Sequence, residues 1–354
     1  MCGGAGTPGV RPRAVLAVQP SAEATKRQAG PVTDSPTVIY IAGSGRSGST
    51  LLERTLGQID GFVNAGELID LFRRTAAHGE RCGCGQAFAS CPFWTRVGTH
   101  AFGGWGDGHL ESVQSLQRHV SRQRHMPRLL AFRLAGRGFR EDVTRYGASY
   151  SSLYRAIVTE TGAACVVDAS KWPVQALALA RAGIDVRVIH LVRDVRGVAH
   201  SLSKAAVARP HAMGETSLMW RNGAASAALR WVACQLQAEA LGRCSIPVTR
   251  VRYEDFVREP RQTVTAALAA LGLPPGPSHL THLSGQHVTL APGHGLSGNP
   301  SRFHNGEITL RADEKWREKM SRRDRAVVTA IGMPLLLRYG WRPRARRSLR
   351  AGAS

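Results

Sequence analysis

The sequence predicts an α/β fold in which helices flank a parallel sheet, and three observations support that prediction. Segments of strand length that are rich in β-branched residues occupy residues 38–41, 164–167, 186–192 and 248–251. Each run precedes a segment whose apolar residues recur at helical spacing. Strands that alternate with helices along a chain build parallel sheets. With 354 residues the chain can bury a core and could form one large domain or two small ones, of which we expect a single domain.

The first predicted strand, 38–41, leads into a loop suited to binding an anion. Residues 43–50 read GSGRSGST. Glycines permit the backbone angles that turn successive N–H groups toward one point, and Ser47, Ser49 and Thr50 add hydroxyl donors at a helix N-terminus. Arg46 adds a charged fork of donors. These features predict a P-loop-like phosphate site.

The loop departs from a nucleotide-triphosphate loop at one position. Gly43 and Gly48 have the spacing G-x-x-x-x-G, but Ser49 stands where that motif has its lysine. That lysine reaches the terminal phosphates, and the next hydroxyl holds Mg²⁺, so its absence favours transfer of a less charged group. Asp168 keeps a rival interpretation open, because a kinase or nucleotide hydrolase can hold Mg²⁺ with an aspartate at a strand end.

A second set of anion donors follows the predicted strand 186–192. Arg193 stands at the end of this strand, and Ser201 lies one to two turns inside the next predicted helix. With the first loop they predict a site for a ligand phosphorylated at two places. Taken singly, Arg193 could pair with Asp194 on the surface, and Ser201 could be an ordinary helix residue.

Two charged residues are placed for catalysis. Glu67 precedes a predicted helix at 68–72, about twenty residues after the phosphate loop, and Lys171 lies in the turn between a strand and the helix that Pro173 begins. Such turns line the edge at which open α/β sheets bind ligands. Glu67 could instead be only a favourable partner of the helix dipole.

The charge balance indicates polyanionic partners. Lys and Arg number 47 against 25 acidic residues, a net charge of +22, which fits nucleic acid, acidic lipid or small phosphorylated ligands. A basic nucleic-acid-binding protein is therefore a second alternative, although aromatic residues are not interleaved with the basic motifs. We expect no specific nucleic acid, no transmembrane segment and a cytoplasmic protein, and peripheral contact with an anionic membrane stays open.

The composition also divides the chain. Residues 1–36 are rich in Gly, Pro, Ala, Ser and Arg, and this composition predicts a disordered leader. We expect residues 37–340 to form the catalytic domain and residues 341–354 to form a basic tail. An irregular insertion at about 79–147 is expected over the mouth of the site.

The insertion contains a cluster of cysteines. Cys82, Cys84 and Cys91 have the spacing C-x-C-x₆-C and could bind zinc with a fourth ligand such as His78 or His100. Because this spacing departs from the usual C-x₂₋₄-C pairs, we favour a packed, reduced loop and expect no metal.

Two segments, SGRSGSTLLERTL and VIHLVRDVRGVAHSL, resemble the two cofactor signatures of sulfotransferases that use 3′-phosphoadenosine-5′-phosphosulfate, PAPS. The resemblance covers roughly residues 38–339 and extends to RYEDFV and SGNPSRF, which resemble parts of a bacterial branch; other motifs are similar to those of protein-tyrosine sulfotransferases. It implies transfer of the sulfuryl group of PAPS to a hydroxyl of a small-molecule, lipid or glycan acceptor, without Mg²⁺, since the group carries a single negative charge.

The resemblance also implies roles for residues. The residues that it assigns to the 5′-phosphosulfate are Arg46, Ser47, Gly48, Ser49 and Thr50. Arg193 and Ser201 would hold the 3′-phosphate, Tyr253 would touch the nucleotide, and Ser301 and Arg302 would belong to a loop that closes over it. Glu67 matches the family's general base and Lys171 its stabiliser of the leaving phosphate oxygen, which Arg46 would assist. Because cytosolic relatives use a histidine base, His78, His100 and His109 are reserve candidates.

Overall fold

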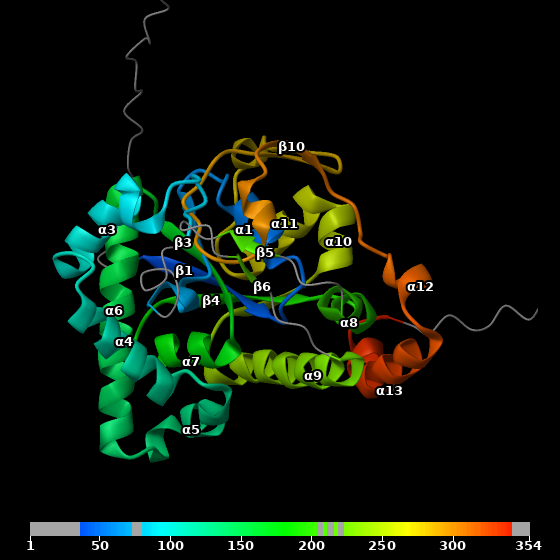
Figure 1. Ribbon diagram of the computed structural model, residues 1–354, viewed down its shortest axis with the longest axis horizontal. Helices are drawn as coiled ribbons and strands as arrows, with labels where there is room; N and C mark the ends of the chain where they lie inside the picture. The colour runs from blue at the N-terminus through cyan, green and yellow to red at the C-terminus, as the bar shows by residue number, and fades with distance from the viewer. Residues whose placement is uncertain (1–35, 73–79, 204–207, 211–215, 219–222, 342–354) are drawn as a thin grey trace, which may run out of the picture. The chain divides into compact units, whose positions relative to one another are not determined.

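A five-stranded parallel sheet lies at the centre of the structure (Figure 1), a computed structural model that describes residues 36–72, 80–203, 208–210, 216–218 and 223–341. Its strands, in spatial order, are β2 (Phe62–Gly66), β3 (Cys165–Lys171), β1 (Thr37–Gly43), β4 (Val186–Val192) and β7 (Val248–Arg252). All neighbours are parallel. The strand order reverses on either side of β1, so the sheet has a topological switch point there.

Helices cover both faces of this sheet because its strands are apolar on both sides. Val38 and Tyr40 face one hydrophobic cluster, and Ile39 and Ile41 face another. The first cluster includes side chains of α6 (Arg137–Thr161), α7 (Pro173–Arg181) and α9 (Ala224–Leu241). The second includes those of α1 (Ser49–Leu56), α10 (Tyr253–Arg258) and α11 (Pro260–Ala270). Figure 1 shows α7 and α9 below the sheet and α1, α10 and α11 above it. These observations confirm the predicted α/β fold.

A third hydrophobic cluster extends the core beyond β4. It joins α8 (Val195–Ser203), α9, α12 (Trp316–Lys319) and α13 (Arg322–Arg338) around the fully buried ring of Trp231. The indole Nε1 of Trp231 donates a hydrogen bond to the backbone oxygen of Arg193 at 3.1 Å. This contact fixes the end of β4, where Arg193 enters the site.

The segment predicted as an irregular insertion is largely helical. It contains α3 (Pro92–Phe102), α4 (Asp107–Val120) and α5 (Met126–Leu130) before α6 begins. Buried Trp94, Val97, Val113 and Val120 give α3 and α4 apolar faces within the same hydrophobic cluster as α6. The glycines that end α3 divide the helical pattern into short pieces, which is why the sequence indicated less order.

Short elements complete the described chain. An antiparallel sheet comprises β8 (Leu283–Ser284), β9 (His287–Leu290) and β10 (Gly306–Thr309), and β5 (Ala208–Pro210) pairs with β6 (Thr216–Leu218). The 3₁₀ helices are η1 (Leu68–Asp70), η3 (Phe88–Ser90), η4 (Gln123–His125), η5 (Phe132–Leu134), η6 (Gly242–Cys244), η7 (Pro277–Leu280) and η8 (Pro300–Phe303). The strand β6 ends well before α9, which begins only after Gly223.

Some sequence predictions fall on residues that the structure does not describe. These are the leader, apart from Pro36, the basic tail, apart from Trp341, and His78. The chain divides into two units, Met1–Pro31 and Val32–Ser354, and every described residue belongs to the second. Among the described helices, none could span a membrane.

Candidate active site

All five parallel strands end at one edge of the sheet, and each leads to a candidate site residue. β1 leads to the loop 44–48, β2 to Glu67, β4 to Arg193 and β7 to Tyr253, while Lys171 is the last residue of β3. Ligands of open α/β sheets bind outside the carboxyl ends of the strands, next to the switch point. The topology therefore brings together residues that are more than 200 positions apart in the sequence.

The loop after β1 has the geometry of an anion cradle. Arg46 and Gly48 adopt left-handed backbone angles, with φ of 67° and 89°. A β-carbon on Gly48 would lie 2.5 Å from the ring of Tyr253, so glycine allows this ring to approach the loop closely. No side chain in the described ranges caps α1, and its first turn contains no acidic residue. Buried Ser47 has no hydrogen-bond partner for its hydroxyl among the described groups. A bound anion would satisfy the backbone donors at the start of α1.

Arg193, which belongs to the second predicted set of anion donors, also contacts this loop. Its guanidinium donates to the backbone oxygen of Arg46 at 2.9 Å and to that of Asp313 at 3.0 Å, and lies 3.5 Å from the Asp313 carboxylate. It also stacks over the ring of Tyr253, 4.7 Å from the ring centre. The predicted alternative, a surface pair with Asp194, is not formed, because Asp194 instead binds Arg196.

Glu67 and Lys171 form an ion pair between the ends of β2 and β3. Each side chain is 14% exposed. Lys171 has φ of 69°, an uncommon value for a residue with a β-carbon, and such strain often marks functional sites. The Glu67 amide donates to the backbone oxygen of Leu296 at 2.8 Å. The helix expected after Glu67 is the short 3₁₀ helix η1.

Glu53, which the sequence analysis missed, holds the backbone just before Glu67. Its Oε1 accepts hydrogen bonds from the Gly66 amide at 2.8 Å and from Asn64 Nδ2 at 3.1 Å. Glu53 is 3% exposed, and this burial raises the pKa of its carboxyl to about 7. Nothing in the sequence distinguishes it from a solvent-facing residue of helix α1.

Asp168 stabilises the backbone near Glu67 and does not itself belong to the ligand site. It is fully buried and accepts hydrogen bonds from the Tyr154 hydroxyl at 2.7 Å and the Ser170 amide at 2.9 Å. The Ser170 hydroxyl in turn accepts from the Ile69 amide at 2.9 Å, two residues after Glu67. Burial raises the pKa of Asp168 to about 6. Asp168 is therefore a structural residue, and the Mg²⁺ role that kept a kinase or hydrolase open is not supported.

Most of the predicted site residues line one cavity of about 390 Å³, a volume within the usual range for ligand sites. Ten of the predicted site residues line it, namely Arg46, Gly48, Ser49, Thr50, Glu67, Lys171, Arg193, Ser201, Tyr253 and Ser301. Gly298, Asn299 and Asp313 were not predicted as site residues but also line it.

Several predicted residues lie elsewhere. Arg302 does not line the cavity: its side chain is buried, donates to the Arg81 backbone oxygen at 3.0 Å and lies 3.6 Å from Glu80. Ser47 is buried and likewise does not line the cavity. Of the reserve bases, His100 pairs with Glu160 at 3.0 Å and His109 packs against a phenylalanine ring; neither lines the cavity.

The loop between β9 and β10 forms one wall of the cavity, and Arg54 of α1 anchors it. The Arg54 guanidinium donates to the backbone oxygens of Ala291 at 3.2 Å and Ser301 at 3.1 Å, and to Asn305 Oδ1 at 2.8 Å. The Asn299 amide donates to the hydroxyl of Thr50 at 3.3 Å. The loop is thus fixed to the phosphate-loop helix near both of its ends.

Together, the parallel sheet and the anion cradle at its carboxyl edge define the class of protein, an α/β protein with a P-loop-like fold. The chain belongs to the sulfotransferase family, whose model matches residues 36–277, more than half of its length. This finding confirms the resemblance noted in the sequence and supports sulfotransferase activity. A comparison with curated proteins gave no match.

Solved sulfotransferase structures are similar to this chain at low sequence identity. The sulfotransferase domain of the Synechococcus PCC 7002 olefin synthase is 20% identical, with 86% of this chain and 96% of that chain covered and a TM-score of 0.44. The sulfotransferase domain of the curacin biosynthetic pathway is 16% identical, with 85% and 97% covered and a TM-score of 0.45. A sulfotransferase from Alicyclobacillus acidocaldarius is 15% identical, with 84% and 95% covered and a TM-score of 0.33. These scores are low, so the family match carries the assignment.

Proposed function

We propose that the protein transfers the sulfuryl group of PAPS to a hydroxyl of a small-molecule, lipid or glycan acceptor. The observation that carries this proposal is the shared cavity, because two anion-binding sets and the pair Glu67 and Lys171 all line it. PAPS has phosphate groups at both ends of its ribose, and its sulfuryl group is the one transferred.

The donor set suits such a nucleotide. The cradle of Arg46, Ser49 and Thr50 at the start of α1 would hold the 5′-phosphosulfate, with the helix dipole and backbone amides adding to the side chains. Arg193 and Ser201 would hold the 3′-phosphate. The contact between Arg193 and the Arg46 backbone keeps the two sets at a fixed separation.

Glu67 and Lys171 would carry out the chemical step. The Glu67 carboxylate would accept the proton of the acceptor hydroxyl as that oxygen forms its bond to sulfur. Lys171 would neutralise the charge that develops on the bridging oxygen as the sulfur–oxygen bond breaks. Because the two side chains pair, Lys171 would have to turn from Glu67 toward the bound phosphate before the carboxylate could act as a base.

Binding and transfer experiments test this proposal. Calorimetry should show that adenosine 3′,5′-bisphosphate binds more tightly than ATP with Mg²⁺, and PAPS labelled in its sulfuryl group should pass label to an acceptor in a cell extract. Mass spectrometry of the labelled product identifies the acceptor class. Tight binding of ATP with Mg²⁺ and indifference to the bisphosphate would contradict the proposal and favour a kinase or hydrolase.

A further inference from the structure

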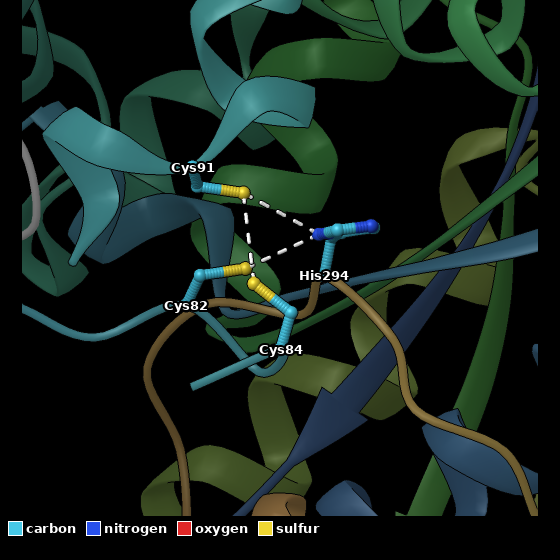
Figure 2. Close-up of side chains that lie close together, drawn as sticks. All are labelled: Cys82, Cys84, Cys91 and His294. Carbon is cyan, nitrogen blue, oxygen red and sulfur yellow. Dashed lines mark hydrogen bonds between the residues drawn. The ribbon is translucent and has the colours of Figure 1, made fainter. Parts of the chain in front are cut away.

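Three cysteines and one histidine converge at a point outside the cavity. The side chains of Cys82, Cys84, Cys91 and His294 point toward one another (Figure 2), and their ligand atoms all lie within 4.8 Å of one another. The cysteines belong to the segment before α3, and His294 belongs to the loop between β9 and β10. The sequence analysis named His78 and His100 as the fourth ligand and missed His294, which is about 200 residues away from the cysteines.

The distances fit a single tetrahedral metal ion. Zinc bonds of about 2.3 Å to sulfur and about 2.0 Å to nitrogen separate two sulfurs by about 3.8 Å and a sulfur from the nitrogen by about 3.5 Å. The structure has 3.7 Å between Cys84 Sγ and Cys91 Sγ, and 3.4 Å from His294 Nδ1 to each of Cys82 Sγ and Cys91 Sγ. A disulfide would instead need about 2.05 Å between sulfurs, and all three cysteines are free.

The surroundings orient these atoms in the manner of a metal site. Cys82 and Cys91 are fully buried. The ring of His294 stacks on Phe93 at 4.5 Å, and Trp94 Nε1 donates to the His294 backbone oxygen at 2.9 Å. Partners of this kind fix the direction of metal ligands.

We propose that Cys82, Cys84, Cys91 and His294 bind one structural Zn²⁺. Thiolate and imidazole ligands select zinc over Mg²⁺ and Ca²⁺, which prefer oxygen, and four protein ligands leave no open position for substrate. This assignment revises our expectation of no metal, and it does not depend on the proposed transfer reaction.

The ion would fasten the β9–β10 loop beside Glu67. Two residues after His294, Leu296 pairs with the backbone of β2 and accepts the Glu67 amide hydrogen bond, while Gly83 donates to the Gly295 oxygen at 3.0 Å. Zinc would thereby connect the helical insertion to a wall of the cavity.

Metal analysis of the full-length protein tests the proposal directly. Protein purified without metal-affinity chromatography should contain close to one zinc ion per chain. A mercurial reagent should release this zinc as it reacts with the thiols. Cobalt taken up in place of zinc should give the visible absorption of a tetrahedral thiolate site. The variants Cys91→Ser and His294→Ala should lose the metal, whereas Cys234→Ser, which removes a buried cysteine distant in sequence from the cluster, should retain it.

Measurements on the wild type keep the test decisive even where a variant fails to fold. Removing zinc with a chelator should lower the thermal midpoint and speed hydrogen exchange at residues 291–299 and 66–72, and added zinc should restore both. Wild-type protein that contains no zinc and does not respond to it would overturn the proposal. An iron chromophore, or a Cys84–Cys91 disulfide found in non-reducing mass spectrometry, would overturn it equally.

Discussion

Replacing Glu53 with glutamine should remove a pH-dependent loss of stability. The carboxyl of Glu53 has an ordinary pKa of 4.5 and a folded-state pKa of about 7 because it is buried, although the hydrogen bond from the Gly66 amide acts in the opposite direction. This difference corresponds to about 3 kcal/mol, at about 1.4 kcal/mol for each pKa unit. The glutamine of Glu53→Gln keeps an oxygen that can accept from Gly66 but cannot ionise.

The sign follows from proton binding. Since the folded state binds this proton more tightly than the unfolded state does, the stabilisation is fully present below pH 4.5 and is lost as the pH rises through about 7. Urea unfolding across this range should show that the free energy of unfolding falls by about 3 kcal/mol more in the wild type than in Glu53→Gln. Contributions from other groups are common to both proteins and cancel in the difference.

An exposed carboxylate provides the control. Glu141 pairs with Arg137 on the surface of α6 and is 57% exposed, so Glu141→Gln should follow the wild-type profile. Parallel profiles for the wild type and Glu53→Gln would refute the reasoning, because they would mean that Glu53 is already ionised at low pH or that the folded state relaxes to hydrate it.

Three further substitutions test the site. Glu67→Gln should keep nucleotide affinity while turnover falls by about 10²-fold or more; unchanged turnover would move the base elsewhere. Arg193→Ala should weaken binding of adenosine 3′,5′-bisphosphate by about tenfold or more in calorimetry. The control Arg196→Ala changes a neighbouring arginine that is paired with an aspartate, so it should not weaken this binding. An effect of Arg193→Ala on stability alone would argue against the 3′-phosphate contact. Gly48→Ala should lower the thermal midpoint, since φ of Gly48 is 89° and the new β-carbon would clash with a tyrosine ring. The control Gly45→Ala should be tolerated, because a β-carbon there would meet open space. Equal midpoints for the two variants would show that the loop shifts to absorb the clash.

The sequence predicted the parts of the site whose signals are local. The strand 186–192 matches β4 at both ends because five of its seven residues are apolar, and the glycines and hydroxyls at 43–50 specify a tight anion loop before a helix. Arg193 and Lys171 could be placed at the sheet edge because the carboxyl ends of parallel strands meet there. Chain topology then brings these local features into one cavity.

Features that depend on distant partners were beyond prediction. Residues 62–66 form the edge strand β2 although their sequence, FVNAG, has a single β-branched residue, because pairing with β3 overrides the weak propensity. Arg302 follows a serine that lines the cavity, yet its buried pairing with Glu80 turns it away. Glu53 and His294 acquire their roles only from segments that fold against them.

The anchoring of the β9–β10 loop by Arg54 has a consequence for ligand exchange. A wall tied down near both ends cannot swing outward as a lid without breaking several buried, charge-assisted hydrogen bonds at once. We therefore expect the proposed donor and its spent nucleotide to enter and leave without displacement of this loop. The loop would already be ordered before the nucleotide binds, so little of the nucleotide's binding free energy would be consumed in ordering the loop.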